Sequence, residues 1–86
     1  MYSVVLSAEA EKIYSSADQA LAKKIARCFE QLEQSPRFHP NIKPLKGELT
    51  SYYRYRIGDY RVIYQIDDDT SQVFVNTIAH RGEVYE

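Results

Sequence analysis

One segment governs the architecture of this chain: residues 52–66, with the sequence YYRYRIGDYRVIYQI. Two runs rich in tyrosine, valine and isoleucine, residues 52–57 and 60–66, flank the pair Gly58-Asp59. Aromatic and β-branched residues favour strands. Glycine followed by aspartate suits a two-residue type II′ turn, because glycine adopts a positive φ at no steric cost. The segment therefore predicts an antiparallel hairpin.

Further strand-favouring sequence follows this hairpin. A loop, Asp67-Asp68-Asp69-Thr70-Ser71, leads into a third β-rich run over Val73–Ala79. On the other side, Pro36–Pro44 reads as a loop because it carries three prolines, and a small extra strand is expected over Leu45–Glu48. The C-terminal half is thus predicted to be an antiparallel meander.

In the N-terminal half, apolar residues recur mainly at the spacing of a helix and not at that of a strand. A short strand over Tyr2–Leu6 is followed by Ser7, a favourable N-cap for a first helix, and Asp18 can cap a second. The second helix should end near Ser35, because Pro36 disfavours helical geometry in the residue before it. Apolar residues recur at helical spacing in both segments: Ala10, Ile13, Tyr14 and Ala17, then Leu21, Ile25, Cys28, Phe29 and Leu32.

These elements predict an α+β fold over residues 1–86, organised as a single domain with the order β-α-α-β-β-β(β). The helical hairpin should pack on one face of a small, mainly antiparallel sheet. The sheet face that receives the helices is expected to carry Tyr53, Tyr55, Ile57, Val62, Tyr64, Ile66, Val73, Val75 and Ala79.

Composition narrows the class of protein. The chain has 86 residues, is 44% hydrophobic and contains only three Gly and three Pro, so it should fold rather than remain disordered. Its single cysteine excludes an intramolecular disulfide and a multi-cysteine zinc site. No apolar run approaches the roughly 18 residues of a membrane span, so the expected location is the cytoplasm, with no membrane partner.

The net charge of −1 conceals a strong asymmetry. Residues 1–36 carry −1, residues 37–61 carry +4, and residues 62–86 carry −4. The basic part coincides with the predicted hairpin. A local basic surface, rather than a basic protein, is the feature relevant to nucleic acid.

The hairpin geometry concentrates this charge. With Gly58-Asp59 as the turn, Arg56 lies opposite Arg61, and the two-residue period places Arg54 on the same face. Directly opposed like charges destabilise a sheet, whereas three guanidinium groups suit bidentate contact with phosphate. The alternative is a solvated face whose arginines are held by Asp59, Glu48 or backbone carbonyl groups.

Other reactive residues have simpler explanations. Cys28 lies on the apolar face of the second helix and is expected to be buried. Consecutive carboxylates at residues 67–69 lack the spacing of a metal loop, so no metal or cofactor is predicted. His80, at the end of the last strand, has a side chain suited to acid–base chemistry or to a hydrogen bond with the backbone. His39, in the proline-rich loop, is a weaker candidate.

Three runs together resemble the RelE/ParE superfamily of bacterial and archaeal toxins, most closely its RelE branch: LKGEL at 45–49, YRIGDYRVIY at 55–64 and IAHRGEVY at 78–85. The resemblance extends over essentially the whole chain. RelE-type toxins are mRNA interferases, metal-independent endoribonucleases that cut mRNA in the ribosomal A site and so inhibit translation. The resemblance implies this activity.

The resemblance also implies residue roles. Arg61, Arg81 and Tyr85 match a catalytic set in the family, while Lys46, Arg54 and Arg56 match residues that bind RNA phosphates. The implied reaction is attack of a ribose 2′-OH on the adjacent phosphate, which needs cationic donors, a base and an acid. Some relatives have a lysine where this chain has Arg54 and Arg56, and arginine does not lose its proton. Proton transfer is therefore assigned to Tyr85 or His80.

Partners follow from the same resemblance. The expected ones are the ribosome with its mRNA and an acidic, RelB-like antitoxin that is partly disordered when free. Operator DNA would be contacted only through the antitoxin. Two alternatives remain at this point: a ParE-like inhibitor of DNA gyrase that cuts no RNA, and a non-catalytic module that binds antitoxin.

Overall fold

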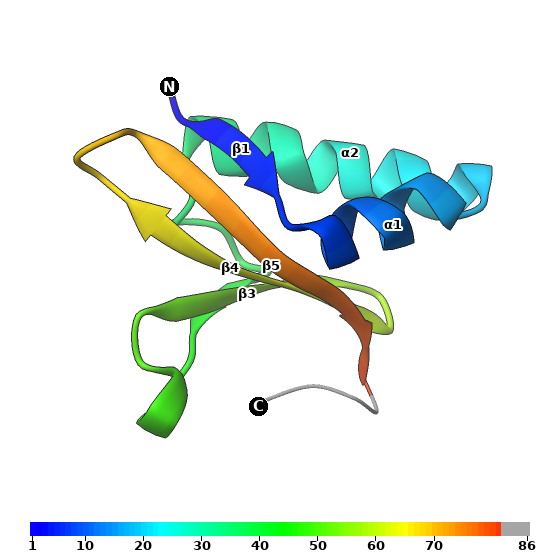
Figure 1. The fold of residues 1–86 in the computed structure, drawn as a ribbon. Helices are drawn as coiled ribbons and strands as arrows, with labels where there is room; N and C mark the ends of the chain where they lie inside the picture. The colour runs from blue at the N-terminus through cyan, green and yellow to red at the C-terminus, as the bar shows by residue number, and fades with distance from the viewer. Residues whose placement is uncertain (82–86) are drawn as a thin grey trace.

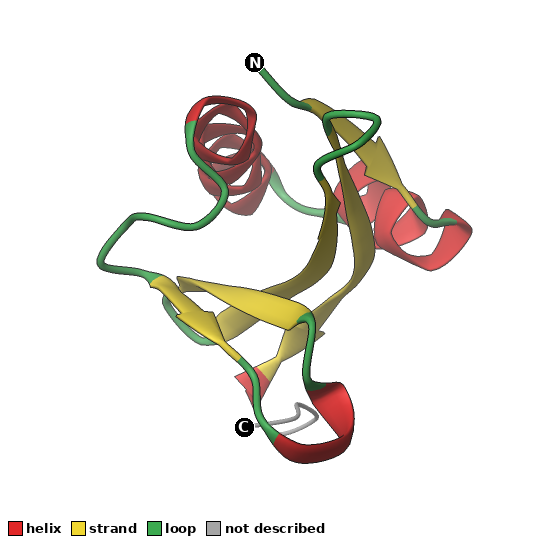
Figure 2. Ribbon diagram, turned by 90° about the vertical axis from the view of Figure 1, so that its left-hand side faces the viewer, coloured by secondary structure: helices red, strands yellow, loops and turns green. Residues whose placement is uncertain are grey.

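Two helices lie on one face of a five-stranded sheet in the computed structural model, which describes residues 1–81 (Figures 1 and 2). The elements in chain order are β1 (Ser3–Leu6), α1 (Ala8–Ser16), α2 (Gln19–Gln34), β2 (Ile42–Pro44), the short 3-10 helix η1 (Gly47–Leu49), β3 (Tyr52–Ile57), β4 (Tyr60–Asp67) and β5 (Gln72–His80). The predicted α+β class and element order are confirmed.

The sheet has the order β1-β5-β4-β3-β2. Its only parallel pair among the described residues is β1 with β5, and the others are antiparallel. The β3–β4 register is the predicted one: Ile57 pairs with Tyr60 and Arg56 with Arg61. Gly58 adopts a φ of 55° while Asp59 has no positive φ, as a type II′ turn requires.

Both helices begin at the predicted caps. The Ser7 hydroxyl accepts a hydrogen bond from the Ala10 amide at 3.0 Å, and the Asp18 carboxylate accepts one from the Leu21 amide at 2.8 Å. Each cap satisfies an amide that the first helical turn leaves without a backbone partner. The second helix ends at Gln34, before Ser35 and Pro36, as predicted.

The core lies between the helices and the sheet. Its fully buried members come from both layers: Ala10, Ile25, Cys28 and Leu32 from the helices, and Val62, Tyr64, Val73 and Val75 from the sheet. The prediction of Ala79 in the core is wrong, because Ile78 takes that place. The β4–β5 register shifts between Ile63 and Tyr64, and this irregularity reverses the faces of the residues that follow in β5.

The extra strand predicted over Leu45–Glu48 is also wrong. The edge strand is β2, three residues earlier, where Lys43 pairs with Arg54. Gly47 has a φ of 69°, which is incompatible with an extended strand, and it begins the short 3-10 helix. Pro44 is tolerated in β2 because β2 is at the edge of the sheet.

A surface cluster joins three distant parts of the chain. The Arg37 guanidinium donates to both carboxylate oxygens of Asp68, at 3.1 and 2.8 Å, and the Tyr2 hydroxyl donates to the same carboxylate at 2.7 Å. These two donors lower the pKa of Asp68. The cluster links the N-terminus, the α2–β2 connection and the β4–β5 loop.

Cys28 provides a test of core burial. Its side chain is fully buried, and burial raises the pKa of the thiol well above its usual range. We expect Cys28 in the folded protein to react with a thiol reagent at least about 100-fold more slowly than in urea, because reaction requires opening of the structure. Equal rates in both conditions would contradict the burial of helix α2 against the sheet.

Candidate functional site

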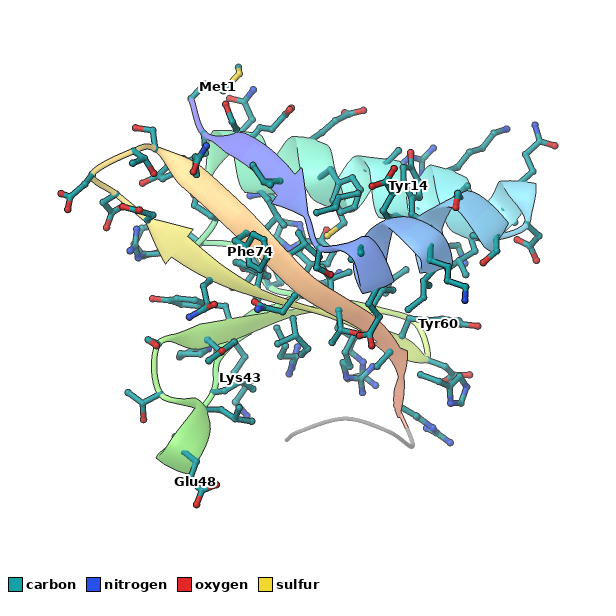
Figure 3. All side chains as sticks on the ribbon, viewed as in Figure 1. Met1, Tyr14, Lys43, Glu48, Tyr60 and Phe74 are labelled. Atoms are coloured by element: carbon teal, nitrogen blue, oxygen red, sulfur yellow. The ribbon has the colours of Figure 1, made fainter. Side chains whose placement is uncertain are left out.

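Four basic side chains lie on the sheet face turned away from the helices, which we call the arginine face. Lys43 of β2 pairs with Arg54 of β3, and Arg56 of β3 pairs with Arg61 of β4. Figure 3 shows Lys43 on the side of the sheet away from both helices. Because paired residues project from the same face, and residues two apart do too, the four cations share one surface. The predicted placement of Arg54, Arg56 and Arg61 on one face of the sheet is confirmed.

Arg61 is the buried member of this face. Only 5% of the residue is exposed, and its Nη1 donates to the carbonyl oxygens of Gly58 and Tyr60, each at 3.1 Å. A buried charge requires hydrogen-bond partners. The carbonyl groups of the β3–β4 turn satisfy part of this need and hold the Arg61 guanidinium in a defined orientation.

Arg54 and Arg56 differ in their surroundings. Arg54 is half-buried, and its Nη1 donates to the Asn41 carbonyl oxygen at 2.9 Å. Arg56 is exposed. The alternative in which backbone carbonyls hold the guanidinium groups is therefore realised for two of the three arginines. A carbonyl dipole does not by itself neutralise a guanidinium.

Arg81 meets the same turn from the end of β5. Its amide donates to the Asp59 carbonyl oxygen at 2.6 Å, and its Nε lies 3.8 Å from Asp59 Oδ1. The side chain is 64% exposed. Arg61 and Arg81, twenty residues apart in sequence, therefore both contact the end of the β3–β4 hairpin, at Gly58, Asp59 and Tyr60.

His80 is not brought to this face. It pairs with Tyr60, with the two rings in an edge-to-face contact at 5.4 Å between centroids, whereas Arg61 pairs with Ala79. Neighbouring residues of a strand project to opposite faces, so His80 lies on the side opposite Arg61. The structure places His80 away from the arginine face, because the shifted register in β5 reverses the alternation.

The other predicted residues lie outside the cluster. Lys46 is exposed and precedes η1 in the connection between β2 and β3. Tyr85 lies outside the described residues. His39 stacks on Tyr55 at 5.2 Å, and its Nδ1 accepts from the Asn41 amide, which is a structural role.

Two features of the site were missed by sequence reasoning. Lys43 was placed in a loop, although its pairing with Arg54 adds a fourth cation to the arginine face. Asp59 was predicted as a turn residue and as a possible counter-ion of the hairpin arginines, but its contact with Arg81 was not predicted. No group of three or more His, Cys, Asp or Glu side chains within residues 1–81 is arranged to hold a metal ion.

Comparison with known proteins identifies the family to which this chain belongs. The family model described as the ParE toxin of type II toxin-antitoxin systems matches residues 4–85. The chain belongs to this toxin family. The toxin is 37% identical to the toxin RelE of Mycobacterium tuberculosis over 70 residues, which cover 78% of this chain and 72% of that protein. It is 40% identical to the toxin RelG of the same organism over 43 residues, and this match spans only 49% of RelG.

Solved structures confirm the fold of the toxin. The archaeal RelE–RelB complex from Pyrococcus horikoshii aligns with a TM-score of 0.81 and 26% identity, covering 96% of this chain and 98% of that one. The RelBE2 toxin–antitoxin complex of Mycobacterium tuberculosis aligns with a TM-score of 0.79 and 26% identity, covering 93% and 98%. The isolated RelE toxin of E. coli shares the fold, with a TM-score of 0.80 over 100% of this chain and 89% of that one, at 23% identity. Together with the sequence relatives, these matches confirm the predicted resemblance: the chain is a RelE-family toxin of a type II toxin-antitoxin system.

The arginine face of the toxin is chemically suited to a chain of phosphates. Its more exposed arginines, Arg54 and Arg56, offer planar donors that match phosphate oxygens, and Arg61 lies buried beside them. No helix among the described residues is long and apolar enough to cross a membrane.

Proposed function

We propose that this toxin is a ribosome-dependent endoribonuclease that cleaves mRNA in the A site and thereby blocks translation in the cytoplasm. The observation that carries the proposal is the convergence of Arg61 and Arg81 on one turn, beside the other cations of the arginine face. The RelE relatives favour this class of activity over a purely binding role.

The proposed reaction is an internal transesterification. The ribose 2′-oxygen attacks the adjacent phosphorus and loses its proton to a base. The bond from phosphorus to the 5′-oxygen of the next nucleotide then breaks, and that oxygen takes up a proton. The products are a 2′,3′-cyclic phosphate and a 5′-hydroxyl end. Negative charge on the phosphoryl oxygens increases on the way to the transition state, so fixed cations are most effective there.

Different side chains are proposed for charge stabilisation, phosphate binding and proton transfer. Arg61, which the turn carbonyls hold in place, and Arg81 are proposed to stabilise the phosphoryl oxygens. Arg54, Arg56 and the more distant Lys46 are proposed to bind flanking phosphates and fix the register of the mRNA. The proton acceptor is assigned to Tyr85 through the family resemblance, since the arginines cannot serve and His80 lies on the other face.

Dependence on the ribosome is consistent with the charge. The net charge of the whole chain is −1, so long-range attraction to free RNA is weak, and only the local basic face favours phosphate. An enzyme of this kind gains from a partner that presents the substrate in a fixed geometry, because orientation supplies a large part of the rate.

The test is cleavage in a reconstituted translation system with mapping of new RNA 5′ ends. We expect new ends inside codons when ribosomes translate the message, and none when the same mRNA is incubated with the toxin alone. Absence of cleavage on ribosomes, combined with inhibition of supercoiling by purified DNA gyrase, would instead establish the ParE-like alternative.

The proposed regulator is a RelB-like antitoxin with an acidic segment that covers the arginine face. The support is the +4 charge of residues 37–61, the two sheet edges formed by β1 and β2, and the RelB-type partners in the solved complexes. We expect an equimolar amount of the antitoxin encoded beside the toxin to abolish cleavage and to protect the β3–β4 hairpin amides from hydrogen exchange. Neutralisation without any protection of this hairpin would contradict the proposed mode of inhibition.

A further inference from the structure

Asp59 is an unexpected residue at a site for phosphate. Its carboxylate lies 3.8 Å from Arg81 Nε, on the turn whose neighbouring carbonyls hold Arg61. A negative charge at this position weakens the local attraction for RNA. The turn itself does not require a carboxylate, because glycine at its first central position meets the conformational demand. A role for the carboxylate itself would offset this cost.

The contacts of Asp59 indicate that role. Its backbone oxygen accepts from the Arg81 amide at 2.6 Å, so the main chain of residue 81 is fixed to the turn. Its side chain approaches the Nε position of the same residue. At 3.8 Å this approach is an ion pair and not a hydrogen bond, and it lies on the Nε side of the guanidinium, which leaves the Nη1–Nη2 edge for two phosphate oxygens. The main-chain hydrogen bond fixes the position of residue 81, and the ion pair favours one orientation of its exposed side chain.

We propose that Asp59 is a positioning residue for Arg81, which sets the guanidinium of Arg81 at a defined spacing from that of Arg61. This inference rests on the proposed endoribonuclease function for its kinetic consequence, but the contact itself can be tested without it. Asp59 acts through Arg81 and does not touch the reacting atoms.

Two variants separate position from charge. Asp59→Ala removes both the acceptor and the negative charge, and we expect kcat for mRNA cleavage on ribosomes to fall about 10-fold, since misplacing a catalytic group is costly. KM should stay unchanged or decrease, because a repulsive charge is lost. Asp59→Asn keeps an acceptor at the same place, and we expect it to retain kcat within about threefold.

A double-mutant cycle with Arg81 gives the decisive comparison. In an Arg81→Ala background, Asp59→Ala should have no further effect on kcat, because the residue that it positions is absent. An equal loss in both backgrounds, or an increase of kcat in both Asp59 variants, would overturn the proposal. Thermal unfolding of each variant checks that the turn still forms.

A spectroscopic measurement tests the positioning without any cleavage assay. In the full chain, the ¹⁵N–¹H heteronuclear NOE of Arg81 Nε should be higher in the wild type and in Asp59→Asn than in Asp59→Ala. Equal values in all three proteins would show that Asp59 does not restrict Arg81. If the wild type cut no RNA, the proposed function would fail while this comparison would still decide the role of Asp59.

Discussion

Arg81→Ala is expected to lower kcat for ribosome-dependent mRNA cleavage by about 10²–10³-fold, the usual cost of removing one donor that faces developing negative charge. The Arg81 side chain is 64% exposed and its partner Asp59 is equally exposed, so the fold should not depend on this side chain. Its main-chain bond to the Asp59 carbonyl does not involve the side chain and should persist in the variant. The loss should therefore appear in kcat, with little change in thermal stability.

The measurement is single-turnover cleavage with toxin-saturated ribosomes, which separates the chemical step from binding. Arg27→Ala is a matched control, because Arg27 is an exposed arginine on helix α2 and not on the arginine face. It should cleave at the wild-type rate. Arg81→Lys keeps the charge but not the planar fork, and an intermediate rate is expected. A wild-type rate for Arg81→Ala would remove Arg81 from the proposed reaction.

The part of this site that the sequence predicted is the part that depends on local alternation. Once Gly58-Asp59 is recognised as a two-residue turn, the pairing of Arg56 with Arg61 follows from counting outward. The prediction failed in β5, because it assumed that the alternation of faces continues unchanged past the register shift. The register shift opposite Ile63 and Tyr64 is accompanied by a hydrogen bond from the Ser7 hydroxyl to the Asn76 carbonyl oxygen. That contact joins residues 69 apart in the chain, so no local pattern reveals it.

The burial of Arg61 could not be predicted from the sequence either. Its acceptors are the carbonyl oxygens of Gly58 and Tyr60, and every residue type carries a carbonyl. A sequence shows which side chains are charged, but it does not show which backbone groups turn toward them. The same reason explains why the Asp59 contact with Arg81 emerged only from the structure, although both residues belong to motifs that were recognised.

Tyr64→Ala is expected to produce the largest loss of stability, about 3–5 kcal/mol of unfolding free energy, the usual range for truncating a large buried aromatic ring. Tyr64 is fully buried, and its ring stacks on that of Tyr53 at 5.7 Å between centroids. Its hydroxyl donates to the Pro36 carbonyl oxygen at 2.7 Å, which ties the α2–β2 connection to the middle of the sheet. A domain of this length has a total stability of roughly 4–13 kcal/mol, so the substitution should remove between about a quarter and all of it.

Tyr64→Phe separates the hydrogen bond from the ring. It keeps the packing and removes only the donor, so we expect a loss of about 1–2 kcal/mol, since the Pro36 carbonyl is left without this partner. Burial raises the pKa of Tyr64 well above its usual range, so the hydroxyl stays protonated and remains a donor through the neutral pH range. Urea unfolding followed by circular dichroism measures both variants. The ratio of the two losses is the informative quantity: a Tyr64→Ala loss no greater than that of Tyr64→Phe would mean that the hydroxyl, and not the buried ring, holds the sheet to the α2–β2 connection.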